Sequence, residues 1–175
     1  GVLKVSAVSW TDFLPGENKA LPEGVTPDSR MEVQLGDVIV SRANTPGLVG
    51  RSVYVRATRP RLLLCDKTLR LVPSVGQLEA QFLNYLLTGE YVRAQIESAA
   101  TGTSMSMKNI SQESLRSLRV ARPPVEEQRR ALTTITALDR RLDDDRQLVT
   151  RLRAIKRETA SALLSGRVPV EVVDA

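Results

Sequence analysis

Histidine is absent from the 175-residue sequence, cysteine occurs once, and aromatic residues make up 3% of it. Without histidine, neither a Ser-His-Asp nor a Cys-His relay can form, and a zinc site lacks its usual nitrogen ligand. The aromatic rings are too few for the stacking platforms of many single-strand nucleic-acid binders. The longest apolar runs, such as residues 62–65, are far too short to cross a bilayer. The composition therefore argues against an enzyme and against a membrane protein.

Phosphate-binding and metal-binding motifs are also missing. No glycine-rich loop ends in Lys-Ser or Lys-Thr, and no Gly-x-Gly-x-x-Gly occurs. Asp28 and Glu32 could open a carboxylate nuclease motif, but no lysine follows them where that motif needs one. The aspartates at 143–145 occupy successive helical positions that point apart, so they predict a solvated face. We expect no catalytic residue, no metal ligand and no cofactor bound by this chain.

Cysteine usage and length bound the location and the size of the fold. The single cysteine, Cys65, excludes an internal disulfide and is typical of a reducing compartment, so we expect a cytoplasmic protein. The start of the chain lacks the basic leader and apolar stretch of a signal peptide. A length of 175 residues predicts either one compact domain or one domain plus an extended appendage.

Positive charge is concentrated in one stretch of the sequence. The net charge is +5, but residues 42–70 alone carry seven basic side chains and one acid, Asp66. Arginine dominates there, and its planar fork suits both phosphate oxygens and the edge of guanine. Two interpretations stay open at this point: a nucleic-acid-binding face, or a solvated surface with scattered arginines. The basic residues are Arg42, Arg51, Arg56, Arg59, Arg61, Lys67 and Arg70.

Hydrophobic periodicity predicts an α+β fold. Short β-branched or alternating runs at 3–8, 37–41, 51–56, 62–64 and 68–72 indicate a small, irregular mixed sheet. Residues 42–47 form a polar turn that Pro46 and Gly47 close. After Gly76 the period changes to that of short helices, interrupted near Thr88-Gly89. Residues 102–109 then form a flexible polar loop.

The last segment predicts one long helix. Pro123-Pro124 precede it, Glu126 and Glu127 place negative charge at its positive end, and Gly166 stops it. About forty residues at ~1.5 Å each make a rod of roughly 60 Å. Its apolar residues form a stripe too narrow for a globular core, which is typical of a coiled-coil seam that needs a partner helix. The seam residues are Leu132, Ile135, Leu142, Val149, Leu152, Ile155 and Leu163.

Several sequence blocks resemble the specificity subunits of type I restriction-modification systems. Residues 123–130 (Pro-Pro-Val-Glu-Glu-Gln-Arg-Arg) resemble the start of their conserved helix, and the segment 163–168 resembles its end. The other blocks resemble parts of their target recognition domains, in the family's order, and they are residues 36–45, 66–71 and 102–110, the last resembling the loop before the final strand. The blocks together span most of residues 36–168.

The resemblance implies a non-catalytic, sequence-specific reader of double-stranded DNA. Residues 1–122 would be one target recognition domain that starts near what resembles its second strand, 123–166 the spacer and dimerisation helix, and 167–175 a tail. In that family each domain reads half of a bipartite target, and paired antiparallel helices set the spacing. Methyltransferase subunits, which bring S-adenosylmethionine, and a motor nuclease subunit would dock on it. The helix would pair with a second recognition half or with another copy.

The resemblance and the base chemistry together suggest DNA contacts. Arg42 and Asn44 are the candidates for base edges, because arginine pairs with guanine and asparagine with adenine in the major groove. The candidates for phosphate or sugar contacts are Thr45, Arg51, Arg56, Ser104 and Lys108. Alternatively, Asn44 caps the turn before Pro46, and Arg42 pairs with Asp37. A different reading of the whole chain is a coiled-coil interaction module that binds no DNA on its own; a carboxylate-metal nuclease would require divalent-dependent cleavage.

Overall fold

The computed structural model describes residues 1–8, 12–102 and 107–166. As predicted, the fold mixes small sheets with short helices and ends in one long helix. The strands are β1 (Val2–Leu3), β2 (Asn18–Lys19), β3 (Val38–Ser41), β4 (Ala43–Asn44), β5 (Ser52–Tyr54), β6 (Thr68–Leu71) and β7 (Lys108–Asn109). The α-helices are α1 (Ala80–Thr88), α2 (Glu90–Ala99), α3 (Gln112–Arg116) and α4 (Val125–Leu164), and the 3-10 turns are η1 (Val5–Ala7), η2 (Ser29–Met31) and η3 (Pro46–Leu48).

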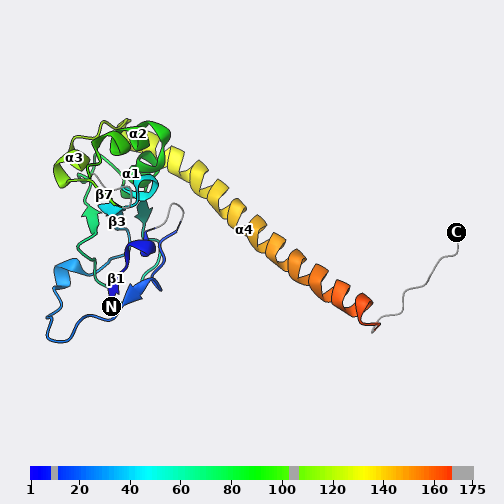
Figure 1. Ribbon diagram of the computed structural model, residues 1–175. Coiled ribbons are helices and arrows are strands. Elements are labelled where there is room, and N and C mark those ends of the chain that lie inside the picture. Colours follow the sequence, from blue (N-terminus) through cyan, green and yellow to red (C-terminus); the bar gives the residue numbers. More distant parts are fainter. Residues whose placement is uncertain (9–11, 103–106, 167–175) are drawn as a thin grey trace. The chain divides into compact units, whose positions relative to one another are not determined.

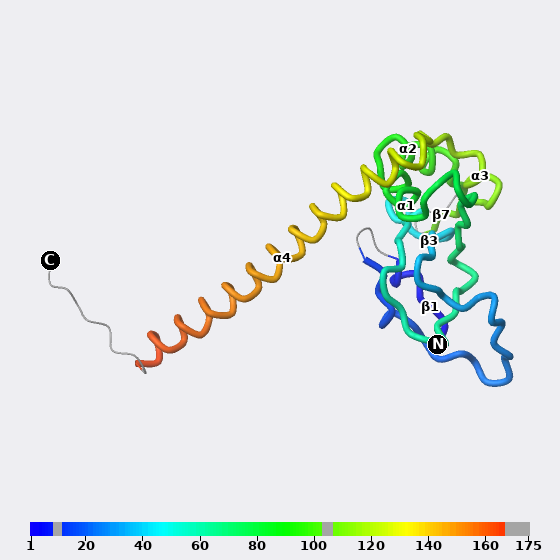
Figure 2. Tube along the Cα trace, turned by 180° about the vertical axis from the view of Figure 1, so that it is seen from behind, coloured from blue at the N-terminus to red at the C-terminus, as the bar shows by residue number. Residues whose placement is uncertain are grey.

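The chain divides into two compact units, Gly1–Arg129 and Arg130–Ala175. The first unit contains all the strands and also the first turn of α4, whereas the second continues that helix. Within Gly1–Arg129, β1 lies toward one end and α1, α2 and α3 lie toward the other (Figures 1 and 2). In the part of the chain that the structure describes, no helix is long and apolar enough to span a membrane.

Three small antiparallel sheets make up the β structure. The central one has the order β5-β3-β6, and the others are the pairs β1-β2 and β4-β7. The middle strand of the three-stranded sheet, β3, is buried along its whole length. Because successive side chains of a strand point to opposite faces, Ile39 enters one core while Val38 and Val40 enter another. β3 therefore joins the two cores of the globular unit.

Each core is assembled from distant parts of the chain. The first core collects side chains from the N-terminal segment and the 62–64 run around Ile39, and the second packs α1, α2 and α3 against the other face of β3. The first contains Leu3, Ala7, Val8, Val33, Ile39, Val53, Val55, Leu62 and Leu64. The second contains Val38, Val40, Val49, Leu87, Val92, Ile96, Ile110 and Leu115.

The strand predicted at residues 3–8 is wrong beyond Leu3. Residues Val5–Ala7 instead form η1, closed by the Ala7 amide donating to the Lys4 carbonyl at 3.0 Å. The adjacent side chains Ala7 and Val8 are both fully buried. A strand would send them to opposite faces, so the tight turn wins because it buries both in the same core.

The helical predictions are confirmed. The break near Thr88-Gly89 separates α1 from α2, with the Gly89 amide donating back to the Leu86 carbonyl at 3.2 Å. α4 begins directly after Pro123-Pro124 and runs for forty residues. Gly166, two residues beyond its end, has a φ of +71°, a left-handed conformation that glycine adopts without steric cost.

Candidate nucleic-acid interface

The polar turn after β3 is built into the sheet framework. Its first residue, Arg42, donates its backbone amide to the Lys67 carbonyl at 2.9 Å and accepts the Ile110 amide at 2.8 Å. Two segments far along the chain therefore meet at Arg42, the turn before β6 and the end of β7. Arg42 itself is partly exposed at this meeting point of the two segments.

Pairing of β4 with β7 brings the predicted turn and the predicted loop together. Asn44 lies opposite Lys108 in the antiparallel register, and Ala43 lies opposite Asn109. Residues directly opposite in such a pair place their side chains on the same side. The Lys108 ammonium group also donates to the Gly102 carbonyl at 2.7 Å. Residues Arg42, Asn44, Thr45, Lys67 and Lys108 are called the β4–β7 surface below.

The Asn44 side chain makes one hydrogen bond to the backbone of the turn before Pro46. Its Oδ1 accepts the backbone amide of Thr45 at 2.9 Å. Thr45 is exposed, and its carbonyl accepts the amides of Leu48 and Val49 at 2.9 Å each. An amide oxygen has two lone pairs, so capping still leaves Asn44 a second acceptor position and its amide donors.

Two side chains donate hydrogen bonds to backbone carbonyls of the turn that carries Thr45. Ser41 donates its hydroxyl to the Leu48 carbonyl at 3.0 Å, and Arg93 of α2 donates to the Val49 carbonyl at 3.0 Å. Gly50 has a φ of +70°, and a Cβ there would lie 2.4 Å from Cγ2 of Ile96. Only glycine fits this left-handed, crowded position, so α2 holds η3 closely.

Burial and charge act on the arginines under this turn. Arg93 is 8% exposed, and desolvation lowers the pKa of its guanidinium below the usual range; Glu97 counters the shift, and the charge of Arg51 adds to it. Arg51 therefore lies within electrostatic reach of Arg93, at the base of the turn. Arg56 is not brought to this place: it lies against α1, where it donates to the Tyr85 hydroxyl at 3.0 Å.

The suggested pairing of Arg42 with Asp37 is wrong. Asp37 pairs with Arg70 at 2.8 Å and also accepts the Gln34 amide at 2.8 Å. Five residues along a strand span roughly 16 Å, which keeps Arg42 out of reach. Arg70 lies opposite Ile39 in the β3-β6 register, so it is the neighbour on the adjacent strand that reaches Asp37.

Lys67 is a residue that the sequence reasoning did not select. It belongs to the basic stretch, and its backbone contact to Arg42 places it at the β4–β7 surface. The signal that could have found it is the Asp66-Lys67 turn after Cys65, which the Thr68 hydroxyl closes by donating to the Cys65 carbonyl at 2.9 Å. Ser104, the remaining predicted DNA contact, lies outside the described residues.

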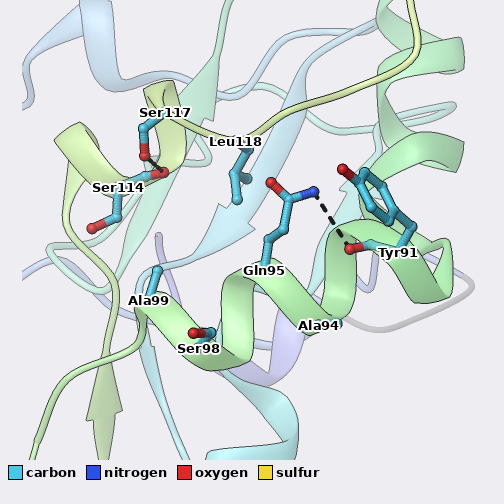
Figure 3. A pocket seen from close by; sticks show the side chains of 8 residues that line it. All are labelled: Tyr91, Ala94, Gln95, Ser98, Ala99, Ser114, Ser117 and Leu118. Atoms are coloured by element: carbon cyan, nitrogen blue, oxygen red, sulfur yellow. Dashed lines mark hydrogen bonds between the residues drawn. The ribbon is translucent and has the colours of Figure 1, made fainter.

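Two hollows open near α2. One adjoins the β4–β7 surface and is lined by one acidic residue, one basic residue and four uncharged ones, which are Glu97, Lys108, Pro46, Gly47, Val49 and Ala100. The other lies between α2 and α3, where mostly small side chains line it and Gln95 donates to the Tyr91 carbonyl at 3.4 Å (Figure 3). Among the described residues, no group of three or more acidic or cysteine side chains could hold a metal ion.

The first turn of α4 is locked into the globular unit by Gln128. This side chain is fully buried. Its Nε2 donates to the carbonyls of Gln77 and Pro123 at 2.9 and 2.8 Å, and its Oε1 accepts the Glu79 amide at 2.9 Å. Next to it, Arg129 pairs with the Glu79 carboxylate at 2.8 Å. The sequence reasoning missed Gln128, because a glutamine in a charged helix gives no sign of burial.

The predicted seam of α4 is open to solvent in the described chain. Leu132 and Ile135 are partly exposed, and the other five seam residues are exposed by about half. Those five are Leu142 at 53%, Val149 at 44%, Leu152 at 54%, Ile155 at 57% and Leu163 at 41%. α4 is one unbroken helix along this seam (Figure 1).

Known proteins resemble this chain in sequence and in fold. Over 135 residues the chain is 36% identical to the type I restriction enzyme EcoEI specificity subunit of Escherichia coli, a stretch that covers 77% of this chain and 23% of that protein. The chain is related to the type I specificity subunits. It spans less than a quarter of the length of that specificity subunit, and no family model matches it.

The fold resembles that of a solved specificity subunit. The crystal structure of the type I restriction-modification system S subunit from M. genitalium has a TM-score of 0.53 to this chain at 21% identity. The likeness covers 74% of this chain and 33% of that one. It supports the α+β fold with small sheets and a long C-terminal helix that the sequence predicted.

Proposed function

We propose that the β4–β7 surface reads duplex DNA, as one target-recognition portion of a type I specificity subunit. The observation that carries the proposal is the pairing of Asn44 with Lys108, which joins the turn after β3 to the loop before β7. Arg42 precedes β4, and Lys67 lies beside it because the Lys67 carbonyl accepts the Arg42 backbone amide. Three basic residues thus meet at a short polar ribbon, a composition that suits phosphates and base edges together.

Within this proposal the side chains divide by chemistry. Arg42 and Asn44 contact base edges, and Asn44 does so with the donors and the acceptor position that capping leaves open. Thr45, Lys67, Lys108 and Arg51, with Ser104, contact phosphate or sugar and fix the register. Arg56 contributes charge from the side of α1. Because η3 is braced by Ser41 and Arg93, the turn meets DNA in a preformed shape, which limits the ordering cost of binding.

The remaining roles are proposed from the family. α4 spaces two half-sites and presents a docking surface for methyltransferase subunits, which carry S-adenosylmethionine, and a motor nuclease subunit joins for cleavage. The chain itself performs no chemistry and binds no cofactor in this scheme, and it works in the cytoplasm. The buried Gln128 supports the spacing role, because it ties the start of α4 firmly to the globular unit.

Binding selection from a random duplex pool tests the DNA-reading role. An enriched motif is expected, and its affinity should fall steeply with salt, because several phosphates are neutralised. Arg42→Ala should cost ~1–3 kcal/mol and relax preference at one position, whereas Lys108→Ala should weaken all sequences alike and reduce the salt slope. Arg30→Ala is the matched control, since Arg30 pairs locally with Asp28. Unchanged binding of both variants in a titration at fixed salt would refute the proposal.

A second candidate function is protein interaction alone. The half-exposed seam of α4 favours it directly, because such a stripe needs a partner helix. A chain that associates in sedimentation yet retains no duplex at low salt would establish it in place of DNA reading.

A further inference from the structure

One acidic residue lies beside the β4–β7 surface. Glu97 of α2 lines the adjoining hollow together with Lys108 and two residues of η3. It is the only acidic residue of that lining, and apart from Lys108 the other lining residues are uncharged. Phosphates repel a carboxylate that lies close to them. Glu97 therefore weakens DNA binding at this place unless it gains a contact of its own.

Contacts between α2 and the turn fix the position of Glu97. Arg93, one turn earlier on α2, is 10% exposed and donates to the Val49 carbonyl at 3.0 Å. Its other terminal nitrogen contacts the Glu97 carboxylate at 3.5 Å. The neighbouring Ile96 packs so closely that a Cβ at Gly50 would collide with it. The Glu97 carboxylate is thus placed before any ligand arrives, which limits the ordering cost of binding.

The contact with Arg93 leaves most of the Glu97 carboxylate available. An ionised carboxylate has about four acceptor positions, and one contact at 3.5 Å occupies at most one of them. The Glu97 side chain is 58% exposed, although its partner Arg93 is buried. A buried ion pair is favourable when its geometry is close and both members are satisfied, whereas Glu97 stays accessible at the hollow. Its position suits a second partner.

A side chain that only accepts hydrogen bonds discriminates among the bases. In the major groove cytosine presents a donor, its exocyclic amino group, whereas guanine and thymine present acceptors. Adenine presents an amino donor next to the acceptor N7, and that pattern suits an amide, because a carboxylate cannot donate to N7. A fixed carboxylate in the major groove therefore favours cytosine over the other three bases.

We propose that Glu97 reads a cytosine, accepting a hydrogen bond from its exocyclic amino group in the major groove. The proposal rests on the proposed DNA-reading function and adds a specificity-determining residue to it. Lys108 lines the same hollow, contacts a phosphate in this scheme and offsets the repulsion between the phosphates and Glu97. The uncharged lining residues are small or apolar, so the edge of the pyrimidine ring can lie against them.

Binding selection with the full chain tests the assignment at the level of sequence. The unchanged chain should enrich a motif in which one cytosine is preferred at least about tenfold over other bases. Glu97→Ala should reduce the preference at that position to less than about threefold and leave the rest of the motif as it was. Glu97→Gln should move the preference to adenine, because glutamine pairs with both N6 and N7 of that base.

A matched variant separates base reading from a general change of charge. Glu23→Gln removes the same negative charge from an exposed loop between β2 and η2, outside the β4–β7 surface. It should leave the preference at every position of the motif unchanged. A Glu23→Gln chain that loses the cytosine preference as Glu97→Gln does would overturn the proposal, because the effect would then come from net charge.

Removing the amino group from the base tests the contact itself. In a duplex of the enriched motif, the chosen cytosine is replaced by pyrimidin-2-one, which lacks that group. Fluorescence titrations at fixed salt should show the unchanged chain losing about tenfold in affinity and Glu97→Ala losing less than about threefold, because the variant has no acceptor to lose. The weaker pairing of the analogue affects both proteins alike, so equal losses in the two would overturn the contact.

A purely structural role for Glu97 would give a different pattern. Glu97→Ala would then lower the melting temperature of the protein without altering the enriched motif, and that result would overturn the proposal. A motif with no position that depends on Glu97 overturns the reading by Glu97 alone, and DNA reading stands. A chain that enriches no motif overturns DNA reading and this proposal with it, so the two failures are distinguishable.

Discussion

The globular unit and the helix that follows it differ in where their apolar side chains go. In Gly1–Arg129, residues such as Leu3, Ile39 and Ile96 are at most 1% exposed. From residue 130 onward, the described part of α4 contributes none of the buried apolar side chains, and its seam is about half exposed. The first unit buries its apolar side chains within one chain, whereas the apolar stripe of α4 stays open to solvent in the described chain. The difference teaches that the globular unit completes its own core, whereas the described part of the helix leaves an apolar face uncovered.

The largest expected effect comes from removing a core side chain of the globular unit. Ile39→Ala empties a site that both neighbouring strands enclose, so the free energy of unfolding should fall by about 2–5 kcal/mol. Leu142→Ala removes an equally large side chain from the exposed seam and should leave the unfolding of the globular unit unchanged while weakening association. Urea titrations followed by intrinsic fluorescence measure the first effect, and sedimentation measures the second. Equal destabilisation by both variants would contradict the comparison.

A somewhat smaller effect is expected at the base of the candidate reading turn. Gly50→Ala forces a side chain into a left-handed backbone and against Ile96, which should cost about 2–4 kcal/mol. Gly47→Ala is the control, because a Cβ there meets nothing within 4 Å. Thermal unfolding of the two variants measures the contrast, and a Gly50→Ala protein as stable as Gly47→Ala would show that α2 does not brace the turn.

The first turn of α4, which belongs to the globular unit, gives a third contrast with the rest of the helix. Gln128→Ala leaves the Glu79 amide and the carbonyls of Gln77 and Pro123 without their partner, which should cost about 1–3 kcal/mol. Gln147→Ala changes the same residue type on the exposed part of α4 and should be nearly neutral. Hydrogen exchange at the start of α4 reports the loss. Exchange that is identical in both variants would mean that Gln128 does not anchor the helix.

The smallest expected effect is a pH dependence at the surface of the globular unit. Hydrogen bonds from the Arg30 side chain and amide lower the pKa of Asp28 below its ordinary 3.8. A carboxylate with a lowered folded-state pKa adds stability above its unfolded value, and this stability is lost as the pH falls through the folded one. Asp28→Asn should therefore lower the melting temperature slightly near neutral pH, leave it unchanged at the acid end, and so flatten the acid side of the stability curve. Melting temperatures between pH 2 and pH 7 check the shape.

The fold could be predicted where local signals decide it. The two prolines at 123–124, the glycine at 166 and the uninterrupted period between them are sufficient for α4, and Gly89 marks the α1–α2 break. The prediction failed at residues 5–7, because the burial of two adjacent apolar residues in one core depends on strands elsewhere in the chain. The division of β3 between two cores also depends on what packs on each face.

The candidate site was only partly readable. Residue type and resemblance together singled out Arg42, Asn44, Thr45 and Lys108. Arg56 was grouped with them because it belongs to the same basic stretch of the sequence, whereas the structure places it against α1. Lys67 and Gln128 were missed because their importance comes from backbone and side-chain contacts about 25 and 50 residues away along the chain.

The sequence by itself determined the long helix, its apolar seam and the order of charges along it, because helix periodicity and chain punctuation are local properties. It also determined the inventory of chemical groups, including the absence of histidine. Only the tertiary structure decided that Asn44 meets Lys108, that Asp37 pairs with Arg70 and that Gln128 is buried. Those outcomes depend on strand register and on the closing of long loops, which are set by packing over the whole globular unit.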